Sequence, residues 1–286
     1  MKRLLLLPYL LPLWGCSQFG VLDSVTPLPR SVNECSGIYT YNGSTFWVLE
    51  DGGNSNKLRE LDTLGNILRS LEIDGVKNND WEALTADTLG NLYIGDFGNN
   101  QNERTDLAIY RVPDPRTLSE DQTTVQVIRF SYPDQKAFPP KKKGLFFDAE
   151  AFFYHGGFLY IITKNRARES DGTATVYRVP DQPGNYVAEI IARIRLCDDS
   201  RTCQVTDAAL SPDGSRLVLL GYGKLWVYEP FSLDGLGRQQ GRLIDLQTNT
   251  QLESVCFAAD TLLVLADERS LGRGGNLYRM PLPRPK

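Results

Sequence analysis

An acidic residue at the start of a predicted β-strand recurs five times along this chain, roughly every fifty residues. The five positions are Glu34, Glu82, Glu150, Asp207 and Glu253. In four repeats a partner position follows fourteen residues later, beyond a tight turn, and the first repeat has three extra residues in its turn. A hairpin centred on such a turn places equidistant residues across the ladder from one another. We therefore expect five cross-strand pairs: Glu34/Asp51, Glu82/Asp96, Glu150/Lys164, Asp207/Gly221 and Glu253/Asp267.

Each repeat contains four predicted strands, which in the second repeat are Glu82–Ala86, Asn91–Gly95, Leu107–Val112 and Thr124–Ser131. Alternating β-branched and aromatic residues bounded by Gly, Asn and Asp turns are typical of strands, and we find no helical periodicity. Four-stranded sheets at this period predict an all-β fold, a single β-propeller of four-stranded antiparallel blades. The first strands give a count of five blades, or six if the Pro- and Lys-rich segment 133–147 contains another.

The last repeat has three predicted strands before the chain ends at Lys286. We expect the segment Val21–Pro27 to supply the fourth strand, so that an N-terminal strand closes the ring. The predicted organisation is a signal peptide over residues 1–15, a lipidated N-terminus with the closing strand over 16–29, and the propeller domain over 30–286. A single all-β domain of this size is common.

The first sixteen residues predict the compartment. Lys2 and Arg3 precede the apolar stretch Leu4 to Leu13, which is too short to span a bilayer and is typical of a secretory signal. The small residue before Cys16 resembles a bacterial lipobox, in which the cysteine is lipidated, and several acyl chains give stable anchoring. Ser17 is not an acidic retention residue, so we expect the outer membrane. The alternative is an ordinary signal peptide with an incidental cysteine.

The charge balance excludes nucleic acid as a partner. The net charge is −4, and removal of Lys2 and Arg3 leaves 29 basic against 35 acidic residues, a net charge of −6. The one basic run, Lys141-Lys142-Lys143, is too short to neutralise a series of phosphates. We expect a monomer attached to the membrane through its lipid, with an unidentified ligand or envelope protein as its partner.

The remaining cysteines form two groups. Cys197 and Cys203 flank a polar loop, and in an oxidising compartment we expect a disulfide between them, which would stabilise the fold by about 2 kcal/mol. Cys35 and Cys256 are on first strands of the first and last blades, where the spacing between strands is too large for a bridge. We expect these two to be buried free thiols.

Several motifs carry a resemblance to a known family. These are Asp80-Trp-Glu-Ala-Leu, Gly90-Asn-Leu-Tyr-Ile-Gly-Asp-Phe-Gly-Asn-Asn, the block Asp148–Ala151 followed by Thr163-Lys164, and the turn Ser211–Gly214. Over most of residues 30–283 the chain resembles secreted bacterial β-propeller lipoproteins, most of them without an assigned function. More distantly it is similar to the SdiA-regulated and NHL-type propellers. The resemblance implies the fold and no reaction, because propellers serve binding, hydrolysis and scaffolding alike.

In a propeller the first strand of each blade lines the central channel, and its start lies at the face that carries the connections between blades. The acidic repeat should therefore gather at one face, with Lys164 as its one cation. The candidate residues for binding a ligand or cation are Glu34, Asp51, Asp80, Glu82, Asp96, Asn99, Asn100, Asp148, Glu150, Lys164, Asp207, Glu253 and Asp267. Carboxylates without histidine favour Ca²⁺, and we expect it at Glu82, Asp96 and Glu150.

The alternative is that these residues have a structural role and bind no ligand. The carboxylates could instead cap backbone amides of the neighbouring blade and close the ring. The loop 96–104, which contains Asn99 and Asn100, either folds round an ion or is a turn whose asparagines cap its own backbone. Lys164 is expected to neutralise Glu150 rather than to act as a nucleophile.

The composition limits the chemistry. His155 is the only histidine and lies at the opposite face, which excludes a Ser-His triad and a histidine-ligated zinc. The first hypothesis is therefore a lipid-anchored envelope propeller, not an enzyme, that binds a ligand, cation or partner at its acidic face. The second is a carboxylate-dependent hydrolase, with or without Ca²⁺, that uses Glu82, Asp96 or Glu150 on a glycan, phosphate ester or lactone. The third is a structural envelope component.

Overall fold

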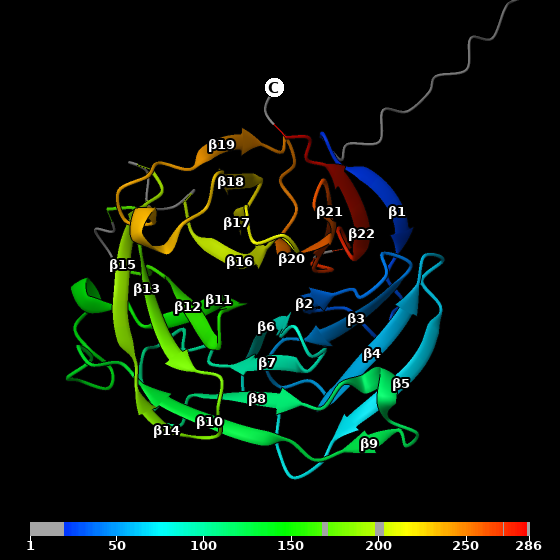
Figure 1. Cartoon of the computed structure of the whole chain (residues 1–286), viewed down its shortest axis with the longest axis horizontal. Helices are drawn as coiled ribbons and strands as arrows, with labels where there is room; N and C mark the ends of the chain where they lie inside the picture. The colour runs from blue at the N-terminus through cyan, green and yellow to red at the C-terminus, as the bar shows by residue number, and fades with distance from the viewer. Residues whose placement is uncertain (1–19, 168–170, 198–202, 271, 285–286) are drawn as a thin grey trace, which may run out of the picture.

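The computed structural model describes residues 20–167, 171–197, 203–270 and 272–284. Five sheets stand round a central axis and form an all-β propeller, as the repeat predicts (Figure 1). The helices among the described residues are three short 3-10 turns, η1 (Pro115–Thr117), η2 (Lys142–Gly144) and η3 (Leu233–Gly235). No helix in these ranges is long and apolar enough to cross a membrane. The predicted signal peptide and Cys16 lie outside the described residues.

Each blade has four antiparallel strands, numbered in chain order. The first blade contains β2 (Cys35–Tyr39), β3 (Thr45–Glu50), β4 (Lys57–Asp62) and β5 (Ile67–Ile73). The second contains β6 (Trp81–Ala86), β7 (Leu92–Asp96), β8 (Ala108–Val112) and β10 (Gln126–Ser131). The third contains β11 (Asp148–His155), β12 (Phe158–Lys164), β13 (Thr173–Pro180) and β15 (Glu189–Arg195). The fourth contains β16 (Val205–Leu210), β17 (Leu217–Gly221), β18 (Lys224–Tyr228) and β19 (Arg242–Asp245). The fifth contains β20 (Leu252–Ala259), β21 (Leu262–Asp267), β22 (Asn276–Pro281) and β1 (Asp23–Pro27).

The N-terminal strand closes the ring. β1 pairs antiparallel with β22, from Asp23 opposite Arg279 to Pro27 opposite Asn276, and supplies the fourth strand that the last repeat lacks. The segment 133–147 contains only η2 and connects β10 to β11, so there is no sixth blade among the described residues. The count of five blades and the N-terminal closure are therefore confirmed.

Two short strands cover exposed sheet edges. β9 (Gln122–Thr123) leaves the second blade and pairs in parallel with β5, the outer strand of the first blade. β14 (Gly184–Val187) leaves the third blade and pairs in parallel with β10 of the second. An uncovered outer strand would present unpaired backbone groups to another chain. Each of these loops thus links a blade to the one before it.

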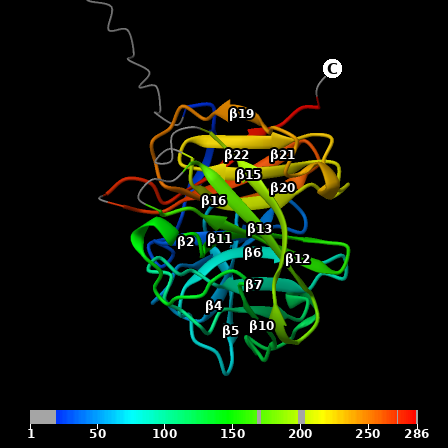
Figure 2. The same cartoon turned by 90° about the vertical axis from the view of Figure 1, so that its left-hand side faces the viewer.

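The apolar residues form clusters between neighbouring blades. Figure 2 shows the same blades from the side. The aromatic residue of each predicted third strand is buried in these clusters: Tyr110, Tyr177, Trp226 and Tyr278 are at most 7% exposed. Alternation along the strands places each of these rings on the face that meets the preceding blade. The blades are therefore held together by side-chain packing rather than by a continuous ladder.

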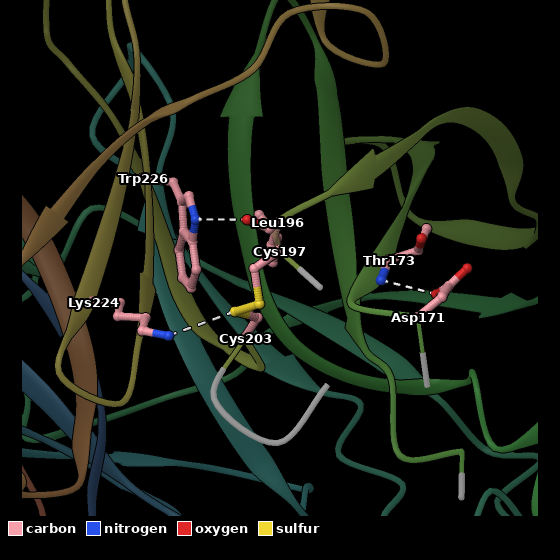
Figure 3. The surroundings of a disulfide bond; sticks show 7 residues. All are labelled: Asp171, Thr173, Leu196, Cys197, Cys203, Lys224 and Trp226. Atoms are coloured by element: carbon pink, nitrogen blue, oxygen red, sulfur yellow. Dashed lines mark hydrogen bonds between the residues drawn. A yellow bond between two sulfur atoms is a disulfide. The ribbon is translucent and has the colours of Figure 1, made fainter. Parts of the chain in front are cut away.

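A disulfide joins Cys197 and Cys203, whose Cα atoms are 6.1 Å apart (Figure 3). It lies at the connection from the third blade to the fourth. Next to it the Trp226 indole Nε1 donates to the carbonyl oxygen of Leu196 at 3.2 Å. Cys35 and Cys256 are buried free thiols. Burial raises the pKa of the Cys35 thiol to about 12, which keeps this thiol protonated and unreactive.

A β-bulge interrupts the first hairpin of every blade. In the second blade Trp81 is opposite Asp96 and Ala83 is opposite Gly95, so Glu82 between them has no partner in the ladder. The unpaired residues at this position are Ser36, Glu82, Glu150, Thr206 and Glu253. A bulge adds one residue to one strand and turns its side chain out of the ladder.

The bulge corrects four of the five predicted cross-strand pairs. Asp96, Lys164 and Asp267 lie opposite Trp81, Asp148 and Leu252 and not opposite the acidic residues Glu82, Glu150 and Glu253. In the first blade the predicted pair is in register, because Cys35 lies opposite Glu50 and the Asp51 backbone amide donates to the Glu34 carbonyl oxygen at 2.8 Å. In the fourth blade Gly221 lies opposite Val205 and not opposite Asp207. Counting equidistant residues from a turn fails here because it assumes a ladder without an inserted residue.

The closing strand generates a stability prediction. Deletion of residues 20–28 removes Leu22 and Leu28, which are 6% and 2% exposed, together with the β1–β22 ladder. Because each buried leucine lost costs about 2–5 kcal/mol, we expect the free energy of unfolding to fall by about 4 kcal/mol or more. Urea unfolding of the parent and the deletion variant measures this loss of stability. Asp23→Ala, an exposed change in the same strand, should alter stability by less than about 0.5 kcal/mol. A deletion variant as stable as the parent would contradict closure by β1.

Candidate functional site

The inner strands β2, β6, β11, β16 and β20 are neighbours round the axis and start at the face that carries the connections between blades (Figure 1). We call this the acidic face. It contains Glu34, Asp51, Asp80, Glu82, Asp148, Glu150, Glu253 and Glu268 with the cations Lys164 and Arg166. Glu268 directly follows the predicted residue Asp267 and was not a sequence candidate.

The bulge position serves two purposes. In two blades it holds a hydroxyl that joins neighbouring blades: Ser36 Oγ donates to the carbonyl oxygen of Trp81 at 2.8 Å, and Thr206 Oγ1 to that of Leu252 at 2.7 Å. An ionised carboxylate cannot donate such a bond. The three blades with glutamate at this position therefore present charge to the acidic face where the other two use a hydroxyl to close the ring.

Asp207 is a backbone cap. Its carboxylate, fully buried, accepts from the backbone amides of Val255 at 2.7 Å and Ala208 at 2.8 Å. It lies one residue beyond the bulge and faces the fifth blade rather than the acidic cluster. This is the structural role that the sequence left open for the acidic repeat.

Asp96 and Asp267 have equivalent roles: each carboxylate accepts hydrogen bonds from the third strand of its own blade. Asp96 accepts from the Tyr110 hydroxyl at 2.9 Å, from Arg104 at 2.9 Å and from the backbone amide of Asp80 at 3.1 Å. Asp267 accepts from the Tyr278 hydroxyl and the backbone amide of Asn276, both at 2.7 Å. Both carboxylates are fully buried, and these bonds occupy both oxygens of each. A further ligand on either carboxylate would therefore replace one of its hydrogen bonds to the protein.

The third blade carries an ion-pair network. Glu150 Oε1 lies 3.1 Å from Lys164 Nζ and 2.8 Å from Arg166 Nη2, and Arg166 Nε also contacts the Asp148 carboxylate. Lys164 therefore neutralises Glu150, as expected, but it is not the one cation of this face. Arg166 lies in the loop after β12, and the strand spacing used to align the repeats gives no signal for it.

The network continues to the fifth blade through a tyrosine. Lys164 Nζ donates to the Tyr222 hydroxyl at 3.2 Å, and that hydroxyl donates to Glu253 Oε1 at 2.9 Å. Burial raises the pKa of Glu253 to about 8, with nearby Glu150 adding to the rise and Lys164 opposing it. At neutral pH this carboxyl is therefore largely protonated.

The loop 96–104 is a hydrogen-bonded turn. Asn99 Oδ1 accepts from the backbone amide of Arg104 at 3.0 Å, and the backbone amide of Asn99 donates to Asp148 Oδ1 at 2.7 Å, which joins the second and third blades. Asn102 adopts a φ of 54°, the left-handed conformation that asparagine tolerates. Asn100 is exposed at the tip of this turn. In the first blade Glu34 accepts from Asn54 Nδ2 at 2.6 Å.

In one carboxylate cluster, no described lysine or arginine forms a direct ion pair, although Arg104 and Arg166 are near enough to lower the pKa of Asp80 against the effect of its burial. Ligand oxygens of Asp51, Asp80 and Glu82 all lie within 4.8 Å of one another. Glu82 is 6% exposed, and no hydrogen bond or ion pair from the described residues reaches the carboxylate oxygens of Asp80 or Glu82. The predicted calcium ligands were Glu82, Asp96 and Glu150. Of these, Glu82 belongs to the cluster, whereas Asp96 and Glu150 are bonded to protein donors.

Two glycines make room for the cluster. A Cβ on Gly98 would collide with Glu82 Oε1 and with the Asp80 carboxylate, and a Cβ on Gly52 would collide with Asp80 Oδ1. Any other residue at these positions would displace the carboxylates. The loops after β3 and β7 therefore enclose the cluster because they carry glycine at the point of closest approach.

Burial and mutual repulsion shape the protonation of the cluster. Burial raises the pKa of Glu82 well above its usual value, and nearby Glu150 and Asp51 add to the rise. Burial also raises the pKa of Asp51 to about 6, against a hydrogen bond from the Gly52 amide that lowers it, and Asp80 adds to the rise. Burial is also the main cause that raises the pKa of Glu268, which lies beside Asp51, to about 7. The ionised cluster is therefore under electrostatic stress that a cation would relieve.

Three solved structures align with this chain at low sequence identity. The PQQ-bound aldose sugar dehydrogenase of Streptomyces coelicolor aligns at a TM-score of 0.52 and 12% identity, over 92% of this chain and 98% of that chain. A nidogen–laminin complex aligns at 0.46 and 11% identity over 87% and 81% of the two chains. The β-propeller domain of Cps50 (Swd1) from Myceliophteria thermophila aligns at 0.43 and 12% identity over 90% and 98%. No protein-family model and no curated protein matches the chain. Likeness at this identity shows the propeller fold alone.

The raised pKa values generate a pH prediction. A carboxyl with a higher pKa in the folded state binds more protons there than when unfolded, so stability falls as pH rises between the two values. In chelator, we expect the free energy of unfolding to fall from about pH 4 to pH 6 through Asp51, whose pKa rises from 3.8 to about 6. Asp51→Asn should flatten this slope, and Glu103→Gln, an exposed change, should leave it unaltered. Urea unfolding at each pH measures the free energy of unfolding. A parent protein whose stability rises from pH 4 to pH 6 would contradict the raised pKa of Asp51.

Proposed function

We propose that this protein is a lipid-anchored envelope β-propeller that binds a divalent cation at its acidic face and, through that cation, a ligand or partner. The observation that carries the proposal is the cluster of Asp51, Asp80 and Glu82, whose ligand oxygens lie within 4.8 Å of one another. A carboxylate as buried as Glu82 ordinarily has a cation or a donor beside it, because an unpaired buried charge is costly.

Calcium fits this donor set best. The cluster offers carboxylate oxygens alone, which hard cations prefer, and no histidine or thiolate that would favour zinc or copper. Calcium takes about six to eight oxygen ligands. Three carboxylates leave room for water and for an oxygen from a ligand or partner. The cation would thus be the point at which the acidic face recognises something else.

Calcium should stabilise the parent protein in a thermal melt, because an ion bound only to the folded state raises stability with its concentration over its dissociation constant. A hundredfold excess over that constant corresponds to about 2.7 kcal/mol. Glu82→Gln keeps the size of the side chain and removes one charge, so it should abolish most of the calcium shift. In chelator the same variant should be as stable as the parent or more stable, since repulsion from Asp51 and Asp80 is relieved.

The matched control is Glu103→Gln, which removes one charge from an exposed position close in sequence and should leave the calcium shift unchanged. Equal destabilisation by Glu82→Gln in calcium and in chelator, with no calcium shift in the parent, would contradict the cation site. That result would favour the third hypothesis, a structural envelope component.

The membrane attachment is proposed from the sequence Leu13-Trp-Gly-Cys16. Cys16→Ser removes the acceptor of the lipid, so we expect the variant to move from the membrane fraction to the soluble fraction and to lose metabolic labelling with palmitate. Ser17 favours the outer membrane as the destination. A variant that still fractionates with membranes, beside an unlabelled parent, would show that Cys16 is not lipidated.

A carboxylate-dependent hydrolase is the second candidate. Glu253, with a pKa raised to about 8, would be a proton donor at neutral pH, and Glu150, paired with Lys164 and Arg166, lies on the adjoining network. A protonated carboxyl and a second carboxyl held by cations are groups that general acid and base catalysis can use. Turnover of a glycan, phosphate ester or lactone that Glu253→Gln abolishes, with the calcium shift intact, would favour this candidate.

A further inference from the structure

A cavity of about 490 Å³ opens at the end of the central axis opposite the acidic face. All five blades contribute to it where their inner strands end, for example through Tyr39, Ala86, Tyr154, Ser211 and Phe257. Its volume is within the range of about 300–1,000 Å³ that is typical of small-molecule sites. It shares none of its lining with the carboxylate cluster, so a ligand there would be separate from the proposed cation.

Aromatic rings form part of the wall of this cavity. Tyr39 and Tyr41 meet edge to face with ring centroids 5.0 Å apart, and Tyr154 stacks against Tyr93 at 6.1 Å. His155, the one histidine of the chain, and Phe257 complete the aromatic part of the wall. Rings held by their neighbours in this way offer flat apolar surface at a low cost in conformational entropy.

The charged residues of the wall are all paired within the protein. The Arg116 guanidinium lies 4.0 Å from the centre of the Tyr41 ring and is bonded to Asp114 at 2.7 Å. Asp87 accepts from the Tyr93 hydroxyl at 3.1 Å and from two backbone amides. Asp213 accepts from Ser211 at 2.7 Å and also pairs with Arg284. A ligand with a net charge would therefore find no free partner, and the wall favours a neutral molecule.

Several polar groups of the wall still have a hydrogen-bond donor or acceptor available for a ligand. In the ranges that the structure describes, the Tyr39 hydroxyl, the Thr85 and Thr88 hydroxyls and the His155 ring make no hydrogen bond to another residue. The Tyr154 hydroxyl accepts from the Gly157 amide at 3.2 Å and keeps its own proton for donation. These groups are donors and acceptors of the neutral kind, suited to hydroxyl groups.

We propose that this cavity is a saccharide-binding site. Flat aromatic faces match the apolar faces of a pyranose ring, and the uncommitted hydroxyls and the imidazole match its hydroxyl groups. The paired charges leave no basis for recognising a phosphate or carboxylate. The proposed ligand is a neutral mono- or disaccharide, and its binding neither needs the cation nor competes with it.

Saturation-transfer NMR and titration calorimetry with glucose, N-acetylglucosamine, maltose and chitobiose test the proposal. At least one of these sugars should bind, in chelator as well as in calcium. Tyr39→Phe, which removes one hydroxyl, should weaken binding about three- to tenfold, the effect of one hydrogen bond. Tyr39→Ala and Tyr154→Ala, which remove a ring, should weaken it by about tenfold or more.

Glu82→Gln is the control at the opposite face and should leave saccharide affinity unchanged, which separates a failure here from a failure of the proposed cation site. Thermal melts of the tyrosine variants establish that they are folded, and Tyr39→Phe keeps the ring in place. Absence of binding by all four sugars at millimolar concentration would overturn the proposal. So would an affinity that Glu82→Gln lowers and the Tyr39 and Tyr154 variants do not.

Discussion

The β-bulge at the start of each inner strand is the constraint on which the acidic face depends. Five strands meet round one axis, and the bulge turns one side chain per blade out of its ladder at the same height. Where that side chain is Ser36 or Thr206, it bonds the next blade and the ring is closed there. Where it is Glu82, Glu150 or Glu253, other contacts join the neighbouring blades, such as the bond from the Asn99 backbone amide to Asp148, and an acidic group is held in a largely buried place.

The three glutamates differ in what neutralises their charge. Glu150 is paired with Lys164 and Arg166, and Glu253 is bonded to Tyr222 and has a pKa raised to about 8, so that it is largely protonated at neutral pH. Glu82 has no ion-pair or hydrogen-bond partner for its carboxyl among the described residues, and burial with the nearby Asp51 and Asp80 raises its pKa. A cation from outside would allow this carboxyl to be ionised. The same principle explains why Asp207, capped by two backbone amides, needs none.

The sequence predicted the architecture because strand patterns repeat locally. The five acidic first strands and the missing last strand were sufficient to predict five blades closed by β1. Four of the five cross-strand pairs were wrong by one or two residues, because spacing does not reveal an inserted residue such as Glu82. Arg166 and Glu268 were missed because they lie in loops whose course is set by contacts between blades. The cluster itself depends on Gly52 and Gly98, whose closeness to Asp80 is a tertiary property.

The central claim is that Asp51, Asp80 and Glu82 form one cation site, and direct calcium binding tests it most directly. Isothermal titration of the chelator-treated protein should give one calcium ion per chain in the parent. Glu82→Gln should lose most of that binding, while Asp207→Asn, which alters a backbone cap of the same charge, should retain the stoichiometry. A parent that takes up no calcium, or a Glu82→Gln variant that binds it as tightly as the parent, would contradict the account.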